Sequence, residues 1–204
     1  MVTAMDENVG RLLKELDSLG IADNTVVIFT SDNGGLSTLG RPGPTHNVNM
    51  RAGKGWCYEG GIRVPFMVRA PGLKGGRVSE TPVVGMDIFP TVLELAGVPL
   101  MPEQHVDGVS LVPELKGKAL KRDALYWHYP HYHGSNWRPG AAIRMGDWKM
   151  VRFYEENEDQ LFNLATDPAE TKNVAQARPK ELRALQQRLE AMQKDTDAKI
   201  PTLR

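Results

Sequence analysis

The pattern of apolar and polar positions predicts an α/β fold for the first half of the chain. From Asp6, apolar residues recur at helical spacing as far as Leu19, and Gly20 follows as a C-terminal cap. The apolar run Val26–Phe29 comes next and does not alternate with polar residues. Such a run is typical of a strand covered on both faces, as in a parallel sheet. A second apolar run at residues 64–70 is expected in the same sheet.

The middle of the chain predicts a short helix followed by antiparallel strands. At residues 86–98, Asp87 supplies an N-cap and Gly97 ends an apolar stripe, which is typical of a core helix. Strands are predicted beyond Lys121 at residues 124–129, 141–145 and 148–153, the last two joined by the two-residue hairpin signal Gly146-Asp147.

Two helix signals lie in the last part of the chain. The stretch Asp167-Pro-Ala-Glu170 has the pattern of a capping box, although an aspartate stands in place of the usual serine or threonine. From Pro179, leucines and methionine recur at helical spacing as far as Met192. This pattern predicts a closing amphipathic helix that packs on the small sheet.

Composition narrows the classes of partner. The chain has 204 residues, 41% of them hydrophobic, with 25 basic and 25 acidic residues. The balanced charge argues against a nucleic-acid partner. No apolar stretch approaches the roughly 20 residues of a spanning helix, so we expect no membrane contact. Cys57 is the only cysteine and excludes an internal disulfide. We expect no export signal in the chain as given, and its compartment stays open.

The polar residues Asp32 and Asn33 directly follow the first predicted strand. Ligands bind at the carboxyl ends of strands in open α/β sheets, and carboxylate and amide oxygens suit calcium or magnesium. The alternative is a plain Asn33-Gly34 hairpin turn capped by Asp32. The residues alone leave both interpretations open.

A second glycine-rich stretch changes this balance. It reads Gly53-Lys-Gly-Trp-Cys-Tyr-Glu-Gly-Gly-Ile-Arg-Val-Pro65. Together with the strand ending in Ser-Asp-Asn-Gly, it resembles the sulfatases of the alkaline-phosphatase-like superfamily. The resemblance covers nearly the whole chain, and its further motifs are Met86-Asp-Ile-Phe-Pro-Thr-Val-Leu-Glu-Leu-Ala-Gly97, Asp107-Gly-Val-Ser-Leu111, Gly146-Asp-Trp-Lys149 and Leu161-Phe-Asn-Leu-Ala-Thr-Asp-Pro-Ala-Glu170.

The resemblance implies a fold class and two parts. Residues 1–122 are expected to be the C-terminal part of the sulfatase α/β domain, with a mixed, largely parallel sheet and helices. Residues 123–204 are expected to form a small C-terminal subdomain with an antiparallel sheet and a helix.

The resemblance also implies roles for individual residues. Asp32 and Asn33 match two ligands of a calcium ion, with magnesium as the other candidate, and Lys54 matches a catalytic lysine that contacts the sulfate ester. A divalent cation and an ammonium group can neutralise the charge of a sulfate ester as its S–O bond breaks. Glu59 and Arg63 are four residues apart, so we expect them to brace the loop as an ion pair.

Part of the family's machinery is absent from this sequence. Sulfatases use a formylglycine made from the cysteine or serine of a C/S-x-P-x-R pentapeptide, and the chain contains no such pentapeptide. Cys57 lacks the following proline and arginine, so we expect a packed residue rather than the nucleophile. Two further metal-binding aspartates of the family lie upstream of the point that matches Met1. We therefore expect the isolated chain to be inactive. We also expect an exposed sheet edge or apolar face, and with it a homo-oligomer or marginal stability.

The stretch Trp127-His-Tyr-Pro-His-Tyr-His133 carries three histidines. A zinc site is one interpretation, but an extended segment does not easily direct all three imidazoles at one ion. By resemblance, His131 and His133 are candidates for substrate contacts at the mouth of the site. An aromatic surface loop is the remaining alternative.

These observations leave three functional hypotheses. The first is a sulfuric ester hydrolase fragment that acts on a sulfate-ester small molecule or a sulfated glycan. The second is a phosphomonoester or phosphonate hydrolase of the same superfamily. The third is a non-catalytic, truncated paralogue that serves as a binding or assembly module.

Overall fold

The computed structural model describes residues 1–37 and 45–201, which fall into two compact units. The first unit comprises residues 1–30 and 65–121, and the second comprises residues 31–64 and 122–204. The structural division therefore assigns the glycine-rich segments to the same unit as the C-terminal sheet. None of the described helices is long and apolar enough to cross a lipid bilayer.

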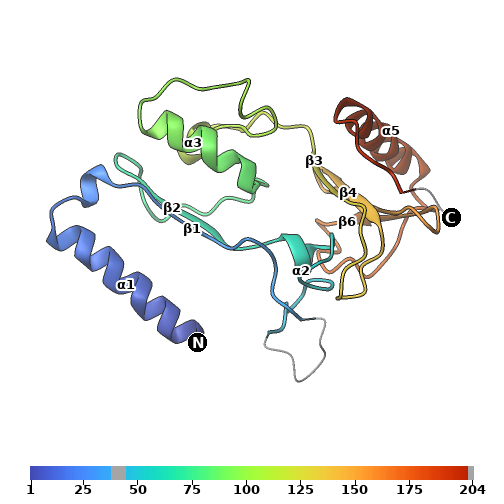
Figure 1. Cartoon of the computed structure of the whole chain (residues 1–204), viewed down its shortest axis with the longest axis horizontal. Helices are drawn as coiled ribbons and strands as arrows, with labels where there is room; N and C mark the ends of the chain where they lie inside the picture. Colours follow the sequence, from blue (N-terminus) through green and yellow to red (C-terminus); the bar gives the residue numbers. More distant parts are fainter. Residues whose placement is uncertain (38–44, 202–204) are drawn as a thin grey trace. The chain divides into compact units, whose positions relative to one another are not determined.

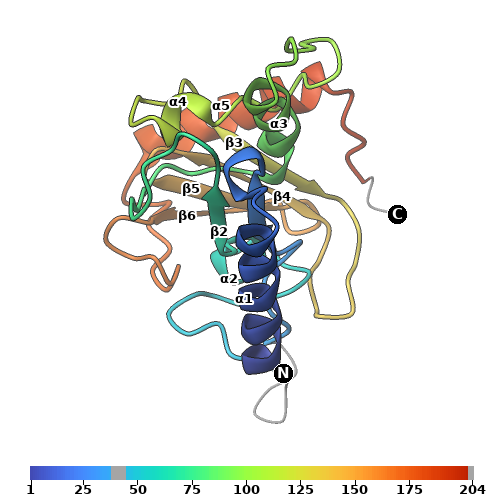
Figure 2. The same cartoon turned by 90° about the vertical axis from the view of Figure 1, so that its left-hand side faces the viewer.

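The first unit begins with one unbroken helix, α1 (Val2–Ser18), which follows the predicted helical spacing (Figure 2). Gly20 ends it with a left-handed φ of 68°, and the Ile21 N–H donates to the Leu16 carbonyl at 3.1 Å. This is the glycine-dependent end expected from the sequence. No residue of α1 is buried. Of its apolar face, Leu12 and Leu19 are exposed, whereas Val9, Leu13 and Leu16 are half-buried.

The strands β1 (Val27–Thr30) and β2 (Phe66–Arg69) pair with each other, as the sequence analysis expected. Their pairing is antiparallel, with Ile28 opposite Val68. The inference of a parallel arrangement from the apolar run was therefore wrong for this pair. The residues of β1 are half-buried or exposed, so a continuous apolar run did not establish strand direction.

The predicted core helix appears as a 3₁₀ turn, η2 (Gly85–Asp87), followed by α3 (Ile88–Leu95). Asp87 is fully buried, but its carboxylate does not cap α3. It accepts instead from the N–H groups of Val84 at 2.9 Å and Val109 at 3.0 Å. Asp87 thus joins two loops of the unit. The unit also contains η1 (Ala22–Asn24) and α4 (Val112–Leu115).

The second unit is built on a four-stranded antiparallel sheet in the order β3-β4-β5-β6. Figure 1 labels β3, β4 and β6 of this sheet, and Figure 2 labels β5 as well. Its strands are β3 (Leu125–Tyr129), β4 (Gly140–Met145), β5 (Trp148–Phe153) and β6 (Glu158–Asn163). The predicted Gly146-Asp147 hairpin joins β4 to β5, since Met145 lies opposite Trp148. Sequence analysis did not identify β6.

Both faces of this sheet are covered because its side chains alternate. Ala141, Ile143 and Met150 pack against Leu185 and Leu189 of α5 (Pro179–Asp195), the predicted closing helix. On the opposite face, neighbouring strand residues pack with the segment around residues 52–58, and the buried members of this cluster are Cys57, Tyr58, Trp137, Ala142, Val151, Phe153, Phe162 and Leu164. The glycine-rich stretch is therefore anchored to the sheet by its aromatic centre.

The helix start predicted at Asp167 is not present. Residues 167–170 form a turn in which the Asp167 carboxylate accepts from the N–H groups of Thr171 at 3.1 Å and Lys172 at 2.8 Å. Glu170 has a left-handed φ of 52° and is completely buried. Its side chain points to another partner, described below, rather than back to a helix N-terminus.

Candidate functional site

The turn formed by Asp32 and Asn33 follows β1 directly in the chain and belongs to the second unit. The Asn33 amide nitrogen donates to Asp32 Oδ2, and the Ser31 hydroxyl donates to the Asn33 carbonyl at 2.9 Å. Asp32 is exposed and Asn33 is half-buried. Asp32 therefore lies at the surface of the unit, and Asn33 is partly covered.

The alternative of a simple hairpin at Asn33-Gly34 is not supported. The described residues 31–37 contain no strand, and the partner of β1 is β2, far along the chain. Gly34 is buried, and its N–H donates to the Gly61 carbonyl at 2.8 Å. The turn is therefore continued by a backbone contact with the second glycine-rich stretch.

The glycines of the two stretches are required by close backbone approach. A Cβ atom added to Gly34 would lie 1.8 Å from the Gly60 carbonyl oxygen, and one added to Gly53 would lie 2.3 Å from the Gly35 oxygen. The Lys54 N–H donates to that same Gly35 oxygen at 3.0 Å. Because larger residues cannot fit, the spacing of glycines encodes the contact of these two segments.

Asn47 holds the glycine-rich segments together from one side chain. Its amide nitrogen lies 2.9 Å from the Gly60 oxygen and 3.0 Å from the oxygens of both Gly35 and Ala52. An amide group carries two N–H donors, so these acceptors share them. Asn47 was not predicted from the sequence, because an isolated asparagine within a long polar loop matches no motif.

Lys54 and His133 approach each other through Gly55. Lys54 is exposed, and Gly55 has a left-handed φ of 85°. A Cβ on Gly55 would lie 2.1 Å from His133 Nδ1, so the imidazole packs directly on this glycine. The Ser135 N–H donates to the same nitrogen at 3.1 Å. Of the two histidine candidates, His133 is thus fixed beside the lysine loop, whereas His131 is exposed.

The zinc interpretation of the histidine stretch finds no support in the described residues. His128 Nδ1 lies 2.7 Å from the Tyr154 hydroxyl, and His133 Nδ1 is engaged by Ser135. Among residues 1–37 and 45–201, no group of three histidine, cysteine, aspartate or glutamate side chains could hold a metal ion.

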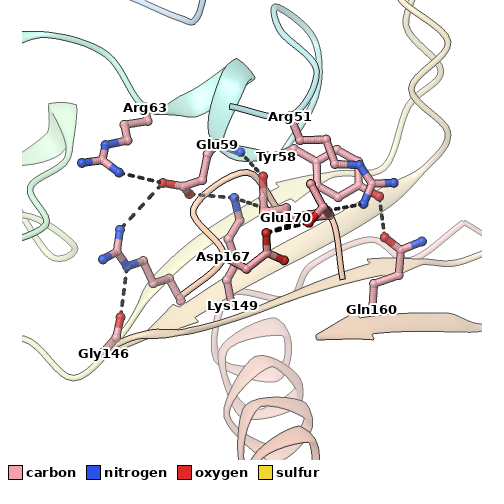
Figure 3. A network of polar contacts seen from close by, with 11 residues as sticks. Arg51, Tyr58, Glu59, Arg63, Gly146, Lys149, Gln160, Asp167 and Glu170 are labelled. Carbon is pink, nitrogen blue, oxygen red and sulfur yellow. Dashed lines mark hydrogen bonds and ion pairs between the residues drawn. The ribbon is translucent and has the colours of Figure 1, made fainter. Parts of the chain in front are cut away.

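A buried charge network lies beneath the glycine-rich segments (Figure 3). The Lys149 ammonium lies 2.8 Å from Glu59 Oε1 and 2.9 Å from Glu170 Oε1. The second oxygen of Glu170 accepts from the Glu59 N–H at 2.7 Å. Relative exposures are 0% for Lys149, 2% for Glu59 and 0% for Glu170. We call these residues the Glu59–Lys149–Glu170 triad.

The expected Glu59–Arg63 ion pair is present, and the triad adds a closer partner for Glu59. Arg63 Nη1 lies 4.0 Å from Glu59 Oε2, at the limit of an ion pair, and Arg144 Nη1 lies at 3.9 Å. The close partner of Glu59 is Lys149, 90 residues away in sequence. Burial raises the pKa of Glu170, and the neighbouring Lys149 ammonium partly offsets this shift.

Cys57 has the packed position expected for it, and its neighbour Tyr58 also has a structural role. The Tyr58 hydroxyl donates to Gln160 Oε1 at 2.6 Å, and the Arg51 guanidinium carbon lies 3.9 Å from its ring centroid. Arg51 Nη1 also donates to the Glu170 carbonyl at 3.0 Å. Cys57 is 4% exposed, and burial raises the pKa of its thiol to about 12. A buried, protonated thiol is a packed residue rather than a nucleophile.

The donor set of the turn fits part of a calcium site. Asp32 and Asn33 offer hard oxygen ligands, the type that calcium prefers. Calcium usually takes about six to eight oxygens, and the described residues contain no group of three or more histidine, cysteine, aspartate or glutamate side chains that could hold a metal ion. The turn therefore suits a site that other ligands would have to complete.

Family profiles match almost the whole chain. Residues 52–196 match the profile described as N-sulphoglucosamine sulphohydrolase, C-terminal, and residues 1–98 match the profile described as Sulfatase. A sulfatase of Formosa agariphila is 37% identical over 198 residues, covering 87% of this chain and 35% of the relative. The steryl-sulfatase of Mus musculus is 42% identical, covering 74% of this chain and 25% of the relative.

Solved structures agree with these matches. Ps i-CgsB, in complex with k-i-k-neocarrahexaose, has a TM-score of 0.80 at 32% identity, covering 94% of this chain and 41% of that one. A protein in complex with its substrate D-glucosamine-2-N,6-O-disulfate has a TM-score of 0.79 at 34% identity, covering 95% and 39%. The phosphonate monoester hydrolase of Agrobacterium radiobacter has a TM-score of 0.74 at 30% identity, covering 96% and 40%.

The matched chains are much longer than this one, which spans 25% to 41% of those described above. Within that share, the mixed α/β architecture, the small antiparallel sheet and the C-terminal helix all agree with the fold predicted from the sequence. The chain therefore belongs to the sulfatase family and corresponds to the C-terminal portion of its fold.

Proposed function

We propose that this chain is the part of a sulfuric ester hydrolase that supplies two metal ligands and a sulfate contact. Asp32 and Asn33 would hold a calcium ion, with magnesium as the other candidate, and Lys54 would contact the sulfate group. The observation that carries the proposal is the backbone bond from Lys54 N–H to Gly35, two residues after Asn33. It keeps the predicted lysine and the predicted metal ligands on one glycine-rich framework.

The chemistry of a sulfate monoester suits these groups. Its negative charge is spread over several oxygens and shifts toward the leaving oxygen as the S–O bond breaks. A bound divalent cation supplies charge stabilisation at those oxygens. The Lys54 ammonium is compact and exposed, so it can bind an oxygen of the same group and hold it in place. The formylglycine nucleophile would come from a segment that this sequence does not contain.

The proposed substrate is a sulfate-ester small molecule or a sulfated glycan. Two of the similar structures are complexes with k-i-k-neocarrahexaose and with D-glucosamine-2-N,6-O-disulfate. His133, fixed against Gly55, and the exposed His131 would then contact the part of the substrate beyond the sulfate. Neutral or protonated imidazoles can both donate hydrogen bonds to sugar hydroxyl and sulfate oxygens.

The chain alone is expected to be inactive, because two metal ligands hold a calcium ion only weakly and the sequence contains no C/S-x-P-x-R pentapeptide. The assay is hydrolysis of p-nitrophenyl sulfate with added calcium. We expect no turnover above a protein-free control. Turnover that disappears in the Asp32→Ala variant would overturn this part of the proposal.

A binding measurement tests the remaining site directly. We expect p-nitrophenyl sulfate and calcium together to shift the amide NMR signals of Asn33, Lys54 and Gly55. Asp32→Ala and Lys54→Ala should each weaken this response. Lys74→Ala is the matched control, since Lys74 is also exposed but lies in the other unit. No shift at any of these amides would contradict the proposal.

The similarity to a phosphonate monoester hydrolase favours a second candidate. The same metal ligands and lysine could serve a phosphonate or phosphomonoester. Titration with phenyl phosphonate beside p-nitrophenyl sulfate separates the two classes by which anion causes the larger shifts. If neither anion shifts these amide signals, the third hypothesis, a non-catalytic binding or assembly module, is favoured.

The exposed apolar surface of the first unit supports a proposed self-association. Met5, Leu12 and Leu19 of α1 are 49%, 57% and 61% exposed, and Phe89 is 44% exposed. Met5, Leu12 and Leu19 recur at seven-residue spacing along one face of α1, and exposed apolar surface of this kind marks contact sites or association hazards. We propose a homo-oligomer formed through α1. We also retain, as a proposal, the division into residues 1–122 and 123–204.

A further inference from the structure

We infer that Lys149 is a positioning residue for the segment that carries Asp32, Asn33 and Lys54. That Asp32, Asn33 and Lys54 bind a metal ion and a sulfate group rests on the proposed function. The contacts that link Lys149 to their segment all lie within the second unit. Lys149 touches none of the three proposed site residues and would act on them through Glu59 and the glycine-rich backbone.

The first step is that Lys149 is held rigidly by the four-stranded sheet. It lies in β5, an inner strand of the four-stranded sheet, with Arg144 of β4 opposite on one side and Phe162 of β6 on the other. Its side chain has no exposed surface. A lysine normally loses much rotamer freedom when it is ordered, so both the strand and the packing fix the position of this ammonium.

The second step is a closed ring of contacts around Glu59. The ammonium holds the Glu59 carboxylate at 2.8 Å and the Glu170 carboxylate at 2.9 Å, and Glu170 accepts the Glu59 N–H at 2.7 Å (Figure 3). Glu59 is thereby held by its side chain and by its backbone. An apolar residue in place of Lys149 could fill the space but could not bring the two carboxylates together.

The third step leads from Glu59 to the proposed metal ligands. Glu59 begins the short helix α2 (Glu59–Ile62), and the Gly60 N–H donates to the Arg51 carbonyl at 2.9 Å. The Gly61 carbonyl accepts from Gly34 at 2.8 Å, directly after Asn33. The path from β5 to the turn therefore consists of two ion pairs, one helical turn and one backbone bond.

The contacts within the triad also explain how three charged side chains can be buried, although burying a charge is unfavourable. Burying ions costs several kcal/mol per ion unless each is paired and hydrogen-bonded. The ammonium is shared by two carboxylates, and Glu170 forms one further hydrogen bond to the Glu59 backbone. The arrangement gives directional contacts, which hydrophobic burial does not supply. Directional contacts are what a positioning role needs.

The experiment measures amide hydrogen exchange in the second unit of the full chain. In Lys149→Met, protection of the Glu59, Gly34 and Lys54 amides should fall roughly 10- to 100-fold, the range set by losing a charged hydrogen bond. The matched control is Arg152→Met in the same strand. Arg152 pairs with Asp159 at 2.7 Å, which is not part of the path, so these amides should keep their protection.

A second variant distinguishes the loss of positioning from the destabilisation caused by unpaired buried charge. Lys149→Met leaves the buried Glu170 carboxylate without its ammonium partner and leaves Glu59 only the distant Arg63 and Arg144, at 4.0 and 3.9 Å, so this variant can fail to fold. Lys149→Met combined with Glu170→Gln removes one of those charges and keeps an acceptor for the Glu59 N–H. The double variant should regain global stability while the Gly34 and Lys54 amides stay less protected than in the wild type.

Wild-type protection at Gly34 and Lys54 in the double variant would overturn the inference, as would an equal loss in Arg152→Met. Failure of the proposed function is recognised separately, because it shows as absent binding of calcium with p-nitrophenyl sulfate to the wild-type chain. Exchange protection does not require any ligand. The two results therefore answer different questions.

Discussion

Replacing Gly34 by alanine should strongly destabilise the second unit. A Cβ at this position would lie 1.8 Å from the Gly60 carbonyl oxygen, and Cβ atoms are essentially never found within 3.0 Å of another heavy atom. The neighbour is backbone, so it cannot rotate away as a side chain could. Gly60 is further held by Asn47 at 2.9 Å and by its own bond to Arg51.

The size of the destabilisation follows from the contacts that the added methyl group would break. The two backbones have to separate by at least 1.2 Å, the difference between 3.0 and 1.8 Å. The bond from the Gly34 N–H to the Gly61 oxygen, now 2.8 Å, would then exceed hydrogen-bonding distance. A buried donor left without a partner costs about 1–3 kcal/mol, and overpacking costs about 1–3 kcal/mol. Together these give a loss of about 2–6 kcal/mol in the free energy of unfolding.

Urea denaturation followed by tryptophan fluorescence measures this loss, since Trp56 and Trp137 both lie in the core of the second unit. Gly134→Ala is the matched control, because a Cβ there meets no atom within 4 Å and should change stability by less than about 0.5 kcal/mol. If Gly34→Ala unfolds at the same urea concentration as Gly134→Ala, the close backbone approach does not exist in solution.

Three further predictions follow from burial and exposure. Cys57 should react with iodoacetamide at pH 8 more than about 100-fold slower in the native chain than in urea, because burial raises the pKa of its thiol to about 12; equal rates would exclude the packed position. Burial also raises the pKa of Glu170 above 4.5, so the native state retains this proton where the unfolded chain has released it. The stability of the wild type relative to Glu170→Gln should therefore fall as pH rises from about 4.5 through the folded pKa, as measured by urea unfolding, and a constant difference would refute this. Leu12→Lys, at a residue 57% exposed in α1, should reduce self-association in analytical ultracentrifugation and leave the helical circular dichroism unchanged; undiminished association would exclude this face of α1 as the contact.

Local signals in the sequence were sufficient where the structure is decided locally. The helix end at Gly20, the hairpin at Gly146-Asp147 and the stripe of α5 all depend on residues within a few positions of one another. Each was predicted, and each is present. The direction of β1 against β2 depends instead on how the chain returns after some 35 residues, and no pattern inside either strand records it.

The error at Asp167-Pro-Ala-Glu170 has the same origin. Asp167 does accept backbone N–H groups, as a cap would. A helix also needs the fourth residue to remain available to it, and Glu170 is withdrawn into the buried site of Lys149. A tertiary ion pair thus overrides a local capping pattern. Asn47 illustrates the remaining limit, because its three carbonyl partners become neighbours only after the segments meet.

Five charged residues of the matching motifs fall into two groups by burial. Asp32 and Lys54 are exposed, whereas Glu59, Lys149 and Glu170 are enclosed, with the ammonium paired to both carboxylates. A group that must meet an anion or a cation from solution has to keep its surface open, and a charge fully paired inside the unit has none left to offer. The two groups meet at Gly34, Gly60 and Gly61, where backbone touches backbone. The matching motifs therefore carry both the groups proposed to bind the ester and the buried charges that hold their frame.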